Sequence, residues 1–156
     1  MGGLIPSYSK AELRKYMDGR LERINDALLM ELQAIGEKVV NHARDLKPPI
    51  SFTDQTGNLR SSIGYGIYIN GKPITKNFKD ASGPKGNKGQ GRRKGEKFAN
   101  SIARKLPKGI SLVVVAGMEY AYYVEANNRD VLTSAERLAK ELVPEMLKQL
   151  KKDIQM

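Results

Sequence analysis

The chain has 156 residues, of which 40% are hydrophobic, and this length and composition fit one folded domain over residues 1–156. It contains no cysteine and one histidine, which excludes disulfide frameworks, thiolate zinc sites, cysteine nucleophiles and a multi-histidine metal site within one chain. No apolar run is long enough to cross a membrane, and the first residues lack the basic and apolar regions of a secretory signal. We therefore expect a soluble intracellular protein, or one assembled inside a cell, with no membrane partner.

The net charge of +10 is concentrated in one segment. Residues 79–97 carry seven basic and two acidic side chains, so half of the net charge lies there. Residues 83–95 have no apolar side chain except proline, and they bury too little surface to offset the entropy lost on ordering. We predict a flexible basic insert over 79–97. It is either a solvated loop, a loop that orders against an acidic neighbour, or a contact for DNA phosphates, with candidate residues Lys85, Lys88, Arg92, Arg93 and Lys94.

Residues 9–46 have the pattern of a long amphipathic helix. Ser9 and Glu12 have the spacing of a capping box, and Lys47-Pro48-Pro49 predicts the end of the helix. Asp18-Gly19 is a candidate break, because glycine destabilises a helix interior. Apolar residues recur every three or four positions, which predicts one continuous apolar face: Leu13, Met17, Leu21, Ile24, Leu28, Leu32, Ile35, Val39, Ala43 and Leu46.

Strand patterns follow. Residues 59–69 alternate in polarity, Asn70-Gly71 is a hairpin turn dipeptide, and residues from Pro73 onward are expected to return as an edge strand. Residues 110–116 form a continuous, largely β-branched run, which predicts a buried central strand.

The remaining segments complete an α+β fold. The apolar spacing predicts a short helix over residues 98–106 and a second long helix over residues 133–153. The segment 120–126 fits either a helical turn or a strand. We therefore predict two long helices packed on a small, mostly antiparallel sheet, with a long basic loop.

No constellation of residues indicates catalysis. The lone His42 lies near the apolar helix face, where a packed or half-exposed structural role is expected, and no nucleophile elbow or phosphate-binding loop occurs. Tyr120, Tyr122 and Tyr123 fit half-buried packing better than a stacking platform. We predict a non-enzymatic protein without catalytic residues, cofactor or metal.

Two segments in this order carry a family resemblance. The first is Asp54-Gln55-Thr56-Gly57-Asn58-Leu59-Arg60-Ser61-Ser62-Ile63. The second runs from Val114 to Ala126 and contains Tyr120-Ala121-Tyr122-Tyr123-Val124-Glu125, followed by Asp130-Val131-Leu132-Thr133 and the final helix. Together they resemble the tail-completion, or head–tail connector, family of long-tailed bacteriophages, also labelled minor tail proteins. Where many members have a glycine after the second motif, this chain has Asn127-Asn128, and asparagine also tolerates positive φ.

The resemblance implies a virion protein of the head–tail junction, made in the cytoplasm of the bacterial host. It implies a ring, hexameric or dodecameric, that joins the connector or adaptor to the tail-tube or tail-terminator protein and lets DNA pass. The family motif and assembly residues would be Thr56, Gly57, Leu59, Arg60, Tyr120 and Glu125.

Two further readings follow from the residues themselves. Thr56-Gly57 is expected to form a tight turn that delivers Leu59 to the core, and Glu125 is a candidate ionic partner of Arg60, within the subunit or across to a neighbour. The alternative function is a small intracellular nucleic-acid-binding protein that uses the basic loop.

Overall fold

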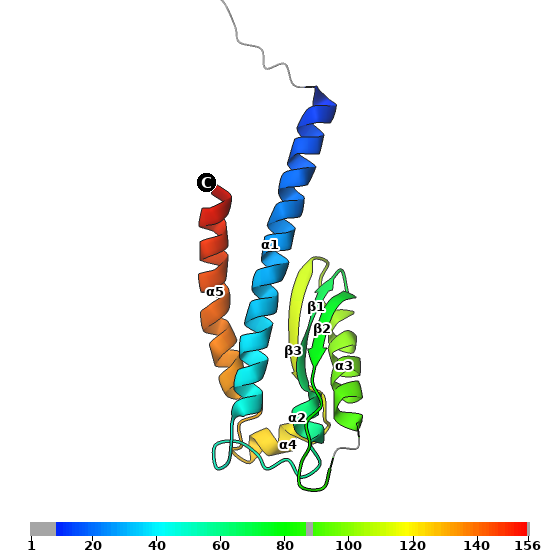
Figure 1. Ribbon diagram of the computed structural model, residues 1–156, viewed down its shortest axis with the longest axis vertical. Coiled ribbons are helices and arrows are strands. Elements are labelled where there is room, and N and C mark those ends of the chain that lie inside the picture. Colours follow the sequence, from blue (N-terminus) through cyan, green and yellow to red (C-terminus); the bar gives the residue numbers. More distant parts are fainter. Residues whose placement is uncertain (1–8, 87–88, 156) are drawn as a thin grey trace, which may run out of the picture.

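The computed structural model describes residues 9–86 and 89–155. Its elements are α1 (Lys10–Asp45), α2 (Asn58–Ser62), β1 (Ile63–Ile69), β2 (Lys72–Phe78), α3 (Gln90–Ala103), β3 (Ile110–Ala116), α4 (Ala121–Ala126) and α5 (Thr133–Gln155). The strands form an antiparallel sheet of order β2-β1-β3, with α1 and α5 on one side and α3 on the other (Figure 1). The α+β class and the small antiparallel sheet are confirmed.

Helix α1 begins at the predicted capping box. The Ser9 hydroxyl accepts from the Glu12 backbone N–H at 3.2 Å, and the Glu12 carboxylate accepts from the Ser9 N–H at 2.8 Å. These bonds also lower the pKa of the Glu12 carboxyl. The helix runs through Gly19 without a break, because its backbone hydrogen bonds continue there and nothing crowds this exposed turn.

The sheet differs from prediction in two places. Residues Asn58–Ser62 form helix α2, so the first strand begins only at Ile63. Strand β1, not β3, is central, and the prediction of a central strand at 110–116 is wrong. The apolar run of β3 has another cause, which is that helices cover both faces of this edge strand. Leu112 and Val114 pack against the core beside α1. Val113 and Val115 pack against α3. The Asn70-Gly71 turn is confirmed, with φ of 52° and 77°.

The predicted long basic loop is not confirmed, because α3 begins at Gln90 and includes most of its basic residues. Four small residues, Gly91, Gly95, Ala99 and Ala103, are buried at a spacing of four. A Cβ atom on Gly91 would lie 2.0 Å from the Asn58 carbonyl oxygen, and one on Gly95 would lie 2.6 Å from that of Ser62. The helix is therefore stabilised by direct backbone packing, which a count of apolar side chains does not detect.

Helix α5 packs mainly against α1 rather than on the sheet. The larger core lies between α1, β1 and α5, and it includes Ile35, Val39, Ile63, Tyr65 and Met146. A smaller core lies between the sheet and α3. In the described part of the chain, no helix is both long and apolar enough to span a bilayer.

Candidate functional site

Both motif segments lie at the end of the fold where α1 ends and α5 begins. Helices α2 and α4, which carry Arg60 and Glu125, both lie at that end (Figure 1). The Gly117 N–H of the second motif donates to the Ser62 carbonyl of the first at 3.1 Å. The segment 120–126, left open between helix and strand, contains the short helix α4. The two motifs are thus neighbours in space although about sixty residues separate them in the sequence.

Arg60 caps the C-terminus of α1. Its guanidinium donates to the carbonyl of Arg44 and, at 3.1 Å, to that of Leu46, and it lies 5.1 Å from the centre of the Phe52 ring. A cation at this end interacts favourably with the helix dipole and satisfies carbonyls that have no partner in the helix. Burial, together with the nearby Arg60 charge, lowers the pKa of Arg44.

Glu125 caps the N-terminus of α5. Its carboxylate accepts from the backbone N–H groups of Val131, Leu132 and Thr133 at 3.0, 3.1 and 3.1 Å, and from the Thr133 hydroxyl. The expected ion pair between Arg60 and Glu125 does not form within the chain, because each charge is satisfied by a different helix end. Asn128 follows with a φ of 58°, which supports the predicted turn.

The Thr56-Gly57 turn has the expected structure. The Thr56 hydroxyl oxygen accepts from the Asn58 N–H at 3.4 Å, and Leu59 is buried in the core. Gly57 has a φ of +69°, and a Cβ atom there would lie 1.9 Å from the Ala81 carbonyl oxygen. This position requires glycine for its conformation and for space, so its role in the chain is structural.

The tyrosine cluster is more exposed than predicted. Tyr122 is 77% and Tyr123 69% exposed, and their rings form an edge-to-face pair with centroids 6.1 Å apart. Of the three, only Tyr120 fits half-buried packing. Its burial raises the pKa of its hydroxyl, and the nearby Asp54 charge raises it further. Tyr120 and Tyr123 line a shallow groove of about 330 Å³ with Phe52 and Arg129. Exposed aromatic pairs of this kind suit a protein interface.

The predicted basic contact residues are divided between a turn and a helix. Lys85 is exposed in the turn before α3, and Lys88 lies outside the described residues. Arg92 and Lys94 on α3 form exposed ion pairs, with Asp80 at 3.9 Å and Glu119 at 3.4 Å. Only Arg93 of the three α3 residues points freely outward, so the five do not form one flexible cluster.

A different basic surface emerges on the outer face of α3. Arg93 and Lys97 of α3 and Arg104, the C-cap of this helix, are spaced by four and seven residues, which places them in one exposed row. None of the three has an ion-pair partner among residues 9–86 and 89–155. Residues 89–109 carry seven basic side chains and one acidic side chain, a net +6.

The first half of α1 carries an uncovered apolar surface. Leu13, Met17 and Leu21 are 52%, 54% and 55% exposed, on a helix that extends well beyond the sheet (Figure 1). Sequence reasoning identified this face but did not show that the sheet and α5 cover only its second half. The sequence cannot distinguish an uncovered apolar face from a covered one, because periodicity predicts that the face is buried but does not identify the element that buries it.

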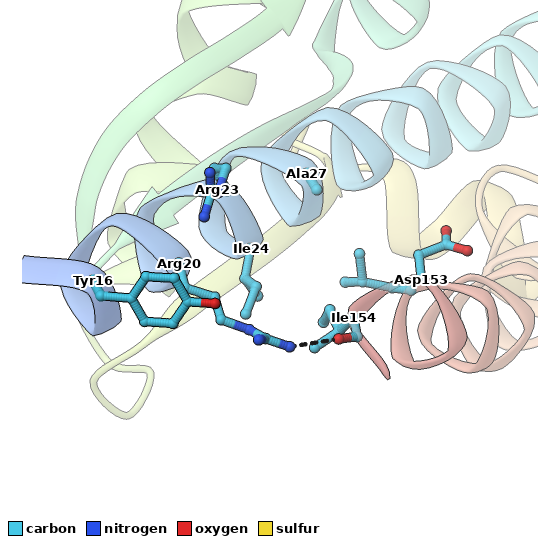
Figure 2. Close-up of a pocket in the computed structure, with 8 residues that line it drawn as sticks. Tyr16, Arg20, Arg23, Ile24, Ala27, Asp153 and Ile154 are labelled. Carbon is cyan, nitrogen blue, oxygen red and sulfur yellow. Dashed lines mark hydrogen bonds between the residues drawn. The ribbon is translucent and has the colours of Figure 1, made fainter. Parts of the chain in front are cut away.

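A groove separates this part of α1 from the end of α5. Its volume is about 380 Å³, and Ile24 and Ala27 of α1 face Leu150 and Ile154 of α5 across it. The Arg20 guanidinium spans the groove and donates to the Ile154 carbonyl at 2.8 Å (Figure 2). The two helices are therefore joined only loosely here.

His42 is exposed, with Nε2 3.0 Å from the Ser134 hydroxyl, so it is not packed on the apolar face.

Within residues 9–86 and 89–155, no group of three or more histidine, cysteine, aspartate or glutamate side chains is arranged to hold a metal ion. Comparison with known proteins gives no match to a family model, a curated protein or a solved structure.

Proposed function

We propose that this protein is a structural subunit of the head–tail junction of a long-tailed bacteriophage, located in the virion and assembling into a ring of six or twelve copies. The motif resemblance supports this function. The supporting structural observation is the uncovered apolar row Leu13, Met17 and Leu21 on α1. A row of this kind on a projecting amphipathic helix is typical of an interface that another subunit covers. In a cyclic ring, it would contact a different surface of the next copy.

The assembly has a direct test in the mass of the purified protein. Light scattering over a wide concentration range, at two salt concentrations and without nucleic acid, should give a discrete species of six or twelve chains. A monomer at every concentration would contradict self-assembly through this surface.

Polar substitution of the row should abolish the ring. We expect the triple change Leu13→Gln, Met17→Gln and Leu21→Gln to remove the six- or twelve-chain species, because the apolar surface buried between subunits is lost. The helix content by circular dichroism should stay unchanged, since these side chains are already exposed.

Met30→Gln is the matched control. Met30 is 73% exposed on the same helix but does not belong to the row, so its replacement should leave the ring intact. Equal loss of assembly in the control, or a persistent ring in the triple variant, would remove α1 from the interface.

The alternative function is nucleic-acid binding, and the row Arg93, Lys97 and Arg104 favours it specifically. Helical cations without ion-pair partners attract phosphates in a sequence-independent way. If α3 holds phosphates, replacing all three residues with alanine should weaken binding to duplex DNA at least about tenfold and lower the salt slope by about 3.

Fluorescence anisotropy with a labelled duplex at several salt concentrations measures this effect. The control replaces Lys148, Lys151 and Lys152, three exposed cations of α5, and so removes the same charge elsewhere. Equal weakening in both variants would indicate only a general attraction to a basic protein and would reject α3 as the site.

A further inference from the structure

The two edges of the sheet are unequal. Edge strand β2 contains Pro73, Lys72 and Lys76. Its pairing with β1 also shifts register between Ile67 and Tyr68. Proline, lysine and bulges are the devices that keep a free edge from pairing with another strand. Strand β3 has none of them, because its seven residues are Ile-Ser-Leu-Val-Val-Val-Ala. The β3 edge is therefore unprotected.

The unpaired backbone groups of β3 point away from β1. At the two ends of this strand pair, the Gly117 N–H donates to the Ser62 carbonyl at 3.1 Å and the Asn70 N–H donates to the Gly109 carbonyl at 2.9 Å. Backbone groups alternate in direction along an antiparallel pair, so those of Leu112 and Val114 face outward. No described strand lies on that side.

An apolar groove runs beside this edge. Leu112 and Val114 of β3 line one side and Leu132, Ala139 and Val143 the other, with a volume of about 540 Å³. Glu136 is the one charged residue in this lining. A strand added to β3 would place alternate side chains over this groove. The surface thus offers both backbone partners and apolar contacts.

We infer that β3 pairs antiparallel with β3 of a second copy of this chain, joining the two sheets across a two-fold axis. The strand is uncharged, so the two copies meet without like charges opposite each other. The charges at the two ends of β3 are complementary, because exposed Lys108 precedes the strand and exposed Glu119 follows it. Antiparallel pairing places Lys108 of each copy beside Glu119 of the other. Pairing of β3 with the β2 edge of another copy is opposed by Pro73 and the lysines there.

The geometry sets a register. When Leu112 of one copy lies opposite Val114 of the other, the outward backbone groups form the bonded pairs and Val113 meets its own copy on the axis. An isologous contact of this kind closes with two chains. It is therefore separate from the α1 contact of the proposed ring, and either one can fail without the other.

Disulfide trapping tests this register directly, because the chain has no cysteine of its own. The Cα atoms of two residues 113 would lie about 4.5 Å apart in a non-bonded pair, within the range of a disulfide. We expect Val113→Cys to form a covalent dimer on mild oxidation, seen by electrophoresis without reductant, and to form none when oxidised in denaturant.

Val115→Cys is the matched control, since Val113 and Val115 are both buried against α3. Residues 115 of the two copies would be displaced by four positions, about 13 Å, which is too far for a disulfide. No covalent dimer with Val113→Cys, or equal dimer formation with both variants, would overturn the pairing.

Two solution measurements accompany the trapping. The unmodified chain is expected to form the ring, so sedimentation is measured on the triple α1 variant. This variant should be a dimer that an added Val114→Lys change converts to monomer, because the new charge would lie in the groove at the paired edge. Lys108→Glu should weaken the dimer, and the combined change Lys108→Glu with Glu119→Lys should restore it. A dimer unaffected by Val114→Lys, or no rescue by the charge exchange, would contradict the antiparallel contact. The triple α1 variant should still form the dimer, which separates this contact from the ring.

Discussion

Replacing Gly95 with valine should unfold the protein or cost about 3 kcal/mol of unfolding free energy or more. Even the first added carbon would lie 2.6 Å from the Ser62 carbonyl oxygen and 2.7 Å from the Phe78 ring. Gly117 approaches from the strand end as well, because a Cβ atom there would lie 2.5 Å from the Gly95 Cα. Helix α3 would have to move off the sheet, and the smaller core would open.

Urea unfolding monitored by circular dichroism measures this loss. Gly19→Ala on α1 is the contrasting control, because nothing lies within 4 Å of a Cβ atom there. It should raise the unfolding free energy by about 0.5–1 kcal/mol, the difference between alanine and glycine in a helix interior. A Gly95→Val variant as stable as the natural chain would mean that α3 does not pack on α2 and the strand ends.

Removing the carboxylate of Glu125 should lower the unfolding free energy by about 2 kcal/mol or more. In a Glu125→Ala variant, the N–H groups of Val131, Leu132 and Thr133 lose their acceptor, and the negative charge at the N-terminus of α5 disappears. Glu125→Gln keeps one acceptor oxygen, so its loss should be intermediate. Urea midpoints of the three proteins measure the series.

Glu119→Ala is the matched control for Glu125. Within one chain, the Glu119 side chain is 89% exposed and its ion pair is the surface one with Lys94, so its removal should change the stability of the single chain by less than about 1 kcal/mol. If Glu125→Ala were as mild as Glu119→Ala, the carboxylate would not be the cap of α5. Its place in the motif would then have to come from contacts between subunits.

The Glu125 prediction concerns a residue that the sequence identified for another reason. Arg60 and Glu125 were singled out by the motif resemblance and were expected to pair with each other. The structure places them at two helix ends, where each is satisfied by backbone groups. A motif residue can thus be essential for the fold that presents an interface without lying in that interface.

Elements that rest on local interactions could be predicted from the sequence. The capping box at Ser9 and Glu12, the turn at Asn70-Gly71 and the apolar period of α1 are readable because their partners lie within a few residues. The α+β class follows from the order of such elements.

What covers each element depends on contacts between distant parts of the chain. Residues 90–97 contain no apolar side chain, yet they are helical because Gly91 and Gly95 allow backbone contact with distant residues. Strand β3 has a sequence typical of a central strand but lies at the edge, since two helix layers, not two strands, bury its faces. Leu13 and Leu32 belong to one apolar row, and only the second lies over the sheet. Burial depends on contacts between residues far apart in the chain, and no local pattern encodes those distances.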